Sequence, residues 1–147
     1  MAAESGGSDE PTGMPGDLPW ESDQRRFQVL IVEDELLTVL DIYDLLENEP
    51  FDITGEAGSA EDAVKAVQGH RPDLVLMDVR LNGAADGIDA ALEIYRRFGV
   101  RCLFATAHVD EHTRARAAPA CPLGWLAKPY GGRQLVQSLR DACAQIA

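Results

Sequence analysis

The sequence lacks clustered positive charge and long apolar runs. Its 13 Lys and Arg residues stand against 25 Asp and Glu residues, which gives a formal net charge of -12. Duplex DNA is bound through clustered Lys and Arg side chains, so we expect no direct binding to DNA. No apolar run is long enough to span a membrane, and the N-terminus lacks the apolar core of a signal peptide. We therefore expect a cytoplasmic protein without membrane segments.

Cysteine is also scarce, and several catalytic motifs are missing. The three cysteines, Cys102, Cys121 and Cys143, are scattered without metal-ligand spacing and fit a reducing compartment. The sequence contains no phosphate-binding G-x-x-x-x-G-K-[ST] loop, no G-x-G-x-x-G after its first predicted strand and no G-x-S-x-G elbow. These absences argue against zinc sites, nucleotide-binding loops and serine hydrolases.

The first 24 residues differ in composition from the rest of the chain. Gly, Pro, Ser and acidic residues dominate them, no Lys or Arg appears before Arg25, and six acids supply half of the net charge. Such a segment buries too little apolar area to offset its ordering entropy. We expect a disordered acidic tail over residues 1–24 and one folded domain over 25–147, a suitable length for a single core.

From Phe27 onward, predicted strands and helices alternate strictly. Five such units predict an α/β fold with a parallel sheet that is covered on both faces. Ser59 is expected to cap the second helix, and Pro119 and Pro122 are expected to stop the fourth. The predicted strands are 27–32, 51–57, 73–78, 101–106 and 124–128, and the predicted helices are 35–48, 59–68, 87–98, 110–118 and 132–146.

The first predicted helix carries apolar residues at helical spacing. We expect them to form the stripe that faces the core. They are Leu36, Val39, Leu40, Tyr43 and Leu46.

Reactive side chains follow four of the five predicted strands, at the edge where functional groups collect in open α/β sheets. Taken singly, each has an ordinary structural explanation. An aspartate after a strand often caps a turn, a threonine at a strand end follows β-propensity, and a lysine before proline usually lies on the surface. Their coincidence on one edge favours a site. They are Glu33, Asp34 and Glu35 directly after the first strand, Asp78 at the end of the third, Thr106 at the end of the fourth and Lys128 at the end of the fifth.

These residue types fit phosphoryl chemistry. Crowded carboxylates raise one another's pKa, and a hard cation such as Mg²⁺ relieves their repulsion. A carboxylate can act as a nucleophile toward phosphorus and form an aspartyl-phosphate. Such a transfer depends mainly on positioning and on charge neutralisation. Lys128 would supply a mobile positive charge and Thr106 a hydrogen-bond donor.

Five motifs together resemble the receiver domains of response regulators in bacterial two-component signalling. They are "LIVEDE", "LVLMDVRL", "DGIDAA", "FATAH" and "GWLAKPY", and the resemblance covers residues 27–146. It implies a flavodoxin-like (βα)5 fold, a doubly wound five-stranded parallel sheet in the order 2-1-3-4-5.

The resemblance also implies roles for individual residues. Asp78 would accept the phosphoryl group. Asp34 would bind Mg²⁺ directly, Glu33 through water, and the backbone carbonyl of Arg80 would complete the metal site together with Asp78. Thr106 would be the switch hydroxyl, Lys128 would bind the phosphoryl group, its bond to Pro129 would be cis, and Trp125 would occupy the aromatic switch position.

The function implied is that of a phosphorylated binding module rather than an enzyme, apart from Mg²⁺-dependent self-phosphorylation and slow self-dephosphorylation. A sensor histidine kinase or phosphotransfer protein would be the donor. A downstream protein would bind the face made by the fourth helix, fifth strand and fifth helix, on a monomer or weak dimer. "FATAH" resembles a motif of a single-domain type common in alphaproteobacteria, with Ala107 in place of that motif's Gly. Because the sequence ends at Ala147, just after the fifth predicted helix, we expect no output domain.

Two alternatives stay open at this point. One is a phosphate sink that drains a shared kinase without output of its own. The other is a flavodoxin-like ligand binder or hydrolase, which would leave Lys128 and the acidic cluster unexplained. Three departures from the family bear on the output: the loop after Asp78 lacks a common proline, Trp125 replaces Tyr or Phe, and Pro119 and Pro122 shorten the fourth helix.

Overall fold

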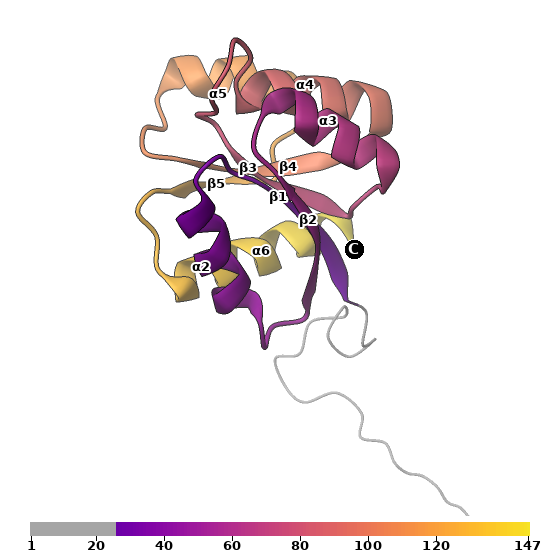
Figure 1. Ribbon diagram of the computed structural model, residues 1–147. Helices are drawn as coiled ribbons and strands as arrows, with labels where there is room; N and C mark the ends of the chain where they lie inside the picture. The colour runs from indigo at the N-terminus through magenta and orange to yellow at the C-terminus, as the bar shows by residue number, and fades with distance from the viewer. Residues whose placement is uncertain (1–25) are drawn as a thin grey trace, which may run out of the picture.

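A computed structural model describes residues 26–147. They form one five-stranded sheet between two layers of helices (Figure 1). The order is β2-β1-β3-β4-β5, and each neighbouring pair is parallel, so the predicted fold class and strand order are confirmed. The predicted tail over residues 1–24 lies outside the described residues. The strands are β1 (Phe27–Val32), β2 (Phe51–Ala57), β3 (Leu74–Asp78), β4 (Arg101–Thr106) and β5 (Gly124–Ala127).

The helices lie where the sequence predicted them and differ only at their ends. Helices α3, α4 and α5 cover one face of the sheet, and α2 and α6 cover the other (Figure 1). Within residues 26–147, no helix is both long and apolar enough to cross a membrane. The helices are α2 (Leu36–Leu46), α3 (Ala60–Gly69), α4 (Gly87–Phe98), α5 (Glu111–Ala117) and α6 (Gly132–Ile146).

Strand β3 lies at the centre of the sheet and is buried along its whole length. Leu74 and Leu76 pack into the core beneath α2 and α6, whereas Val75 and Met77 pack into the core beneath α3 and α4. Both faces of the strand are therefore apolar, which is why its sequence is a continuous apolar run rather than an alternating one. Asp78 ends this strand at the carboxyl edge of the sheet.

The predicted core stripe of α2 is confirmed for Val39 and Leu46 and wrong for Leu36, Leu40 and Tyr43. The buried residues of this helix are Val39, Ile42 and Leu46, whereas Leu36, Leu40 and Tyr43 are exposed. The helix carries apolar residues around most of its circumference, so more than one stripe satisfies helical spacing. The stripe with two β-branched residues packs on the sheet, and the leucine stripe remains on the surface.

Helix ends follow the expected capping chemistry in part. The Ser59 hydroxyl accepts a hydrogen bond from the Asp62 amide at 3.1 Å, as predicted. Helix α5 ends at Ala117, before Pro119 as predicted, but the chain continues in a 3-10 turn (Ala118–Ala120) that includes this proline. Proline is compatible with the first turn of a helix, where its missing N–H is not required. The chain turns away one residue later, at Cys121, which has a left-handed φ of 52°.

Candidate functional site

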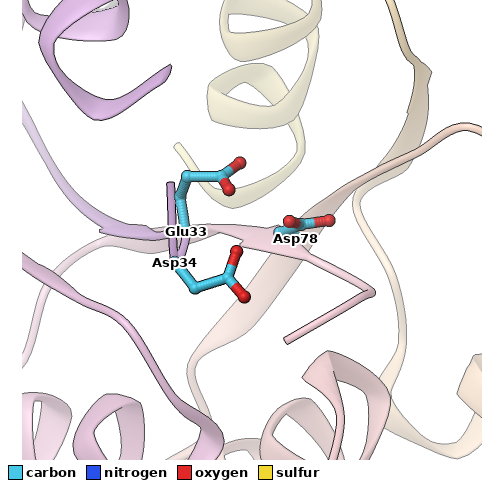
Figure 2. Close-up of side chains that lie close together, drawn as sticks. All are labelled: Glu33, Asp34 and Asp78. Carbon is cyan, nitrogen blue, oxygen red and sulfur yellow. The ribbon is translucent and has the colours of Figure 1, made fainter. Parts of the chain in front are cut away.

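Three carboxylates converge at the carboxyl edge of β1 and β3. Val32 pairs with Met77 in the parallel ladder, so Glu33 and Asp34 leave β1 at the level where Asp78 ends β3. One carboxylate oxygen from each of the three residues lies within 4.8 Å of the others. Glu33 and Asp34 point toward the side on which Asp78 lies (Figure 2). The expected convergence of these acids is therefore confirmed.

Two of the three acids are buried, and a lysine compensates them. Glu33 is 6% exposed and Asp78 7% exposed. Such groups are costly without a partner. The Lys128 Nζ lies 3.0 Å from Glu33 Oε1 and 3.2 Å from Asp78 Oδ2. The positive charge of Lys128 thus compensates the carboxylate at the end of the buried strand β3.

The same contacts shift the pKa values of Glu33 and Lys128. Burial raises the pKa of Glu33 above its ordinary value, and the hydrogen bond from Lys128 offsets only part of this rise. Burial works to lower the pKa of Lys128, but its hydrogen bond with Glu33 and the charges of Asp78 and Glu33 raise it overall. Lys128 is therefore a permanently charged ammonium between the two buried acids at neutral pH.

Backbone amides orient each carboxylate. The Glu35 amide donates to Glu33 Oε2 at 3.1 Å. The Arg80 amide donates to Asp78 Oδ1 at 3.2 Å. The Asn82 amide donates to Asp34 Oδ2 at 3.1 Å, which ties the loop after β3 to the end of β1. Peptide N–H groups of two loops therefore hold the acids in place before any ligand binds.

Thr106 reaches the same edge but is not bonded to Asp78. Asp78 pairs with Ala105, so Thr106 lies one residue beyond it on the neighbouring strand and is buried. The His108 amide donates to the Thr106 hydroxyl oxygen at 3.3 Å. Lys128 follows β5, and its peptide bond to Pro129 is cis, as the resemblance implied. The structure therefore brings the predicted lysine into contact with the acidic cluster and places Thr106 at the same edge of the sheet, with its hydroxyl bonded to His108; the roles of both residues stay predictions.

Trp125 packs inward against the sheet. Its ring stacks on Phe104 with a centroid distance of 4.7 Å and an interplanar angle of 20°. The guanidinium of Arg114, from α5, lies 5.6 Å from the centre of the same ring. A cation over an aromatic face is attracted by the ring quadrupole. The indole thus contacts both a core residue and a helix of the proposed partner face.

The acidic cluster fits a hard divalent cation. Its donors are carboxylate oxygens, which Mg²⁺ and Ca²⁺ prefer over nitrogen or sulfur ligands. Asp34 is exposed and leaves one side of the cluster open to solvent. The Arg80 carbonyl stays a predicted further ligand. Glu33, Asp34 and Asp78 would hold such a cation.

Replacing Asp34 by Asn should raise the stability of the metal-free protein. The change removes one of three mutually repelling charges, worth roughly 1 kcal/mol, and an Asn oxygen can still accept the Asn82 amide. Mg²⁺ should raise the melting temperature of the parent by mass action, and this rise should be smaller in the variant. Calorimetry with and without Mg²⁺ measures both effects. Glu47→Gln, at an exposed position, serves as control; a destabilised Asp34→Asn that responds fully to Mg²⁺ would contradict the site.

An arginine that sequence reasoning missed borders the site. Arg116 of α5 donates to both oxygens of Asp86, at 2.9 and 3.2 Å, and to Asp89 at 3.2 Å. Asp86 and Asp89 form the capping box that starts α4. The D-x-x-D spacing before an apolar run could have indicated this cap. No sequence pattern connects it with Arg116, because 30 positions separate Arg116 from Asp86.

Arg116 therefore links α5 to the start of α4, at the end of the loop that follows Asp78. It lines a cavity of about 510 Å³ together with Asp34, Asp78 and Lys128. Gly87, beside the cap, packs directly on the Asp78 carbonyl, where an added Cβ would overlap the oxygen. The first turn of α4 thus lies on the backbone of the candidate acceptor.

The Arg116 contact should make stability depend on pH. Burial alone would raise the pKa of Asp86, but the hydrogen bonds from Arg116 and Asp89 lower it overall. Because the folded pKa is depressed, this stabilisation is complete above the unfolded pKa of about 4 and is lost as pH falls through the folded pKa. Arg116→Gln should cost at most about 1 kcal/mol, because the pair is partly exposed.

Urea unfolding from neutral to acidic pH measures the difference in the free energy of unfolding between the parent and Arg116→Gln. It should shrink as the solution is acidified. Arg114→Gln removes a charge from the same helix where no carboxylate of residues 26–147 is in contact, and its effect should stay constant with pH. A pH-independent difference for Arg116→Gln would refute the assignment.

The chain is similar to known signalling proteins. The family model of the response regulator receiver domain matches residues 29–140. The transcriptional regulatory protein PdtaR of Mycobacterium tuberculosis is 36% identical over 118 residues, which cover 80% of this chain and 57% of PdtaR. The phyllosphere-induced regulator PhyR of Methylorubrum extorquens is 34% identical over 105 residues, 70% of this chain and 38% of PhyR. The chain thus spans about half the length of PdtaR and less of PhyR.

Solved structures of signal receiver and response regulator proteins superpose on this chain. The signal receiver domain of a modulated diguanylate cyclase from Desulfovibrio desulfuricans G20 superposes with a TM-score of 0.74 at 33% identity, covering 82% of this chain and 95% of that one. A LuxR-family two-component response regulator from Aurantimonas sp. SI85-9A1 gives 0.73 at 26% identity, covering 82% and 86%.

Proposed function

The chain belongs to the response regulator receiver domain family, and from that membership we propose that Asp78 accepts a phosphoryl group from a sensor histidine kinase or phosphotransfer protein. The reaction depends on Mg²⁺, and the phosphorylated domain signals by binding another protein. One observation carries this proposal. Asp78 is a buried carboxylate whose Oδ2 lies 3.2 Å from an ammonium, with two further carboxylates in reach.

The proposed transfer is a displacement at phosphorus. An Asp78 oxygen attacks the phosphorus of a phosphohistidine, the P–N bond breaks, and the imidazole nitrogen keeps the bonding electron pair. Lys128 is placed to neutralise negative charge on the phosphoryl oxygens. Thr106 donates a hydrogen bond to one of these oxygens after leaving His108. Mg²⁺ bound at Glu33, Asp34 and Asp78 would neutralise further charge.

Acetyl phosphate tests the chemistry without a kinase. With Mg²⁺ it should add a single phosphoryl group to the chain, detected by intact mass. Removal of the cation with a chelator should prevent the addition. Labelling at several sites, or labelling that persists in chelator, would count against the proposal.

The exposed apolar face of α2 is the proposed docking surface for the phosphodonor. Leu36 and Leu37 are 69% and 78% exposed, and Leu40 is also exposed. Exposed leucines gathered on one helix mark interaction sites. They directly follow the acids Glu33 to Glu35, so a helical partner seated on them would bring its phosphohistidine to the Asp78 edge. The patch fits an amphipathic helix of the donor.

Leu37→Ser should separate docking from chemistry. Phosphotransfer from the partner kinase, identified by profiling sensor kinases, should slow by about tenfold, equivalent to about 1.4 kcal/mol. Labelling by acetyl phosphate should be unchanged, because this small donor needs no docking surface. An equal loss of phosphorylation rate with both donors would indicate damage to the site. An unchanged rate with the kinase would show that the donor docks on another surface.

A phosphate sink is the second candidate function. Trp125 is already packed against Phe104 and Arg114. If it stays there after phosphorylation, the face made by α5, β5 and α6 does not change, and the domain drains phosphoryl groups without output. A flavodoxin-like ligand binder fits less well, because it gives no role to the contacts of Lys128 with Glu33 and Asp78.

A further inference from the structure

The loop between β3 and α4 carries the single Asn-Gly dipeptide of the sequence, Asn82–Gly83. Both residues are exposed and lie outside helices and strands. Gly83 has a φ of 107°, and a Cβ added there would meet no atom within 4 Å. Among residues 26–147, no hydrogen bond involves the Gly83 amide or the Asn82 side chain. The Gly83 amide and the Asn82 side chain are therefore free to react with each other.

We propose that Asn82–Gly83 is a site of spontaneous deamidation that adds a carboxylate to the phosphorylation pocket. The Gly83 backbone nitrogen, which no side chain shields, loses its proton to solvent and attacks the Asn82 side-chain carbonyl carbon. The bond from that carbon to the amide nitrogen breaks, and ammonia leaves with a proton from water. Water then opens the cyclic imide at either carbonyl, which gives an aspartyl or an isoaspartyl residue at position 82. No oxidant or enzyme is required.

The neighbouring Asp86–Gly87 pair has similar chemistry but is protected by the structure. The Gly87 amide donates to the Val79 carbonyl at 2.8 Å, and Gly87 is buried in the first turn of α4. The Asp86 carboxylate accepts from the Asp89 amide and from Arg116. Neither the nucleophile nor the carbonyl carbon can rearrange without breaking this network. We therefore expect Asn82 to deamidate, whereas Asp86, four positions later, should not rearrange in the folded chain.

The new carboxylate would lie beside the acidic cluster. The Asn82 amide is 3.1 Å from Asp34 Oδ2, and Asn82 lines the cavity that holds Asp78 and Lys128. An added negative charge attracts a divalent cation more strongly, because hard cations bind more tightly as the charge of their surroundings grows. The isoaspartyl form also inserts a methylene group into the backbone at position 82. This lengthens the chain between the position-82 amide, which donates to Asp34, and the start of α4. The modification would thus change the pocket without any change in Asp78.

Prolonged incubation of the full chain at mildly alkaline pH tests the covalent step. Peptide mapping should find aspartyl and isoaspartyl products at position 82, formed at least an order of magnitude faster than deamidation of Asn48, which precedes Glu49. Asp86 should isomerise only after denaturation. Unmodified Asn82 in the folded chain, or isomerisation of folded Asp86 at the same rate, would overturn the proposal.

Two variants test the consequence for the pocket. Asn82→Asp reproduces one product, and Asn82→Gln keeps a neutral amide in a side chain that cyclises slowly. Asn82→Asp should lower the Mg²⁺ concentration needed for half of the thermal stabilisation severalfold relative to Asn82→Gln. Equal Mg²⁺ responses would overturn the proposed effect on the pocket. Failure of acetyl phosphate to label the parent would refute the proposed function and leave the peptide-mapping result intact.

Discussion

Asp78→Asn should abolish phosphorylation of the chain by acetyl phosphate and by kinase alike. Asparagine has nearly the shape of aspartate, but its amide is not a nucleophile toward phosphorus. Its oxygen can still accept the Arg80 amide, which now donates to Asp78 Oδ1. Lys128 keeps Glu33 as a partner at 3.0 Å. The variant should therefore fold, and the whole loss should lie in the chemistry.

Intact-mass measurement after incubation with acetyl phosphate and Mg²⁺ checks this result. Asp141→Asn, which removes an exposed carboxylate of α6, should be labelled like the parent. Circular dichroism should confirm that both variants are folded. Undiminished labelling of Asp78→Asn would mean that another carboxylate is the acceptor, and Asp34 would be the next to test.

The sheet was predictable because each strand and helix has a pattern of its own. The apolar run before Asp78 indicates a strand buried on both faces, and β3 is buried throughout. Strict alternation leaves little choice except a parallel sheet with helices on both faces. Since parallel strands bring their carboxyl ends to one edge, the meeting of Glu33, Asp34 and Asp78 followed from the topology.

Other features depend on contacts that no local pattern records. The α2 helix is apolar on several sides, so periodicity could not tell which stripe faces the sheet and which, with Leu36 and Leu40, stays exposed. The contact of Arg116 with Asp86 joins two segments that are adjacent only after α4 and α5 have packed.

The packing of Trp125 determines how the output can be tested. Phe104 pairs with Trp125, and Thr106 pairs with Ala127, in the ladder between β4 and β5. Phe104 and Thr106 lie two residues apart and so share one face of β4. A shift of Thr106 from His108 toward a phosphoryl group on Asp78 would therefore disturb the end of the strand on which the indole stacks. The guanidinium of Arg114, over the same indole, couples the ring to α5.

Beryllofluoride with Mg²⁺, which mimics a phosphoryl group on Asp78, should shift the emission of Trp125. Trp20, which lies outside the described residues, is first replaced by Phe so that a single indole reports. The shift should disappear in Thr106→Ala, because alanine has no hydroxyl to move toward the mimic. Arg114→Gln should change the resting emission by removing the cation from the ring, yet keep the response. NMR shifts near Asp78 should confirm that the mimic binds in every variant.

An unchanged spectrum of the parent with bound mimic would refute the switch, because the ligand would then leave the surface of α5, β5 and α6 in one state. The phosphate sink would then be the better account of this domain.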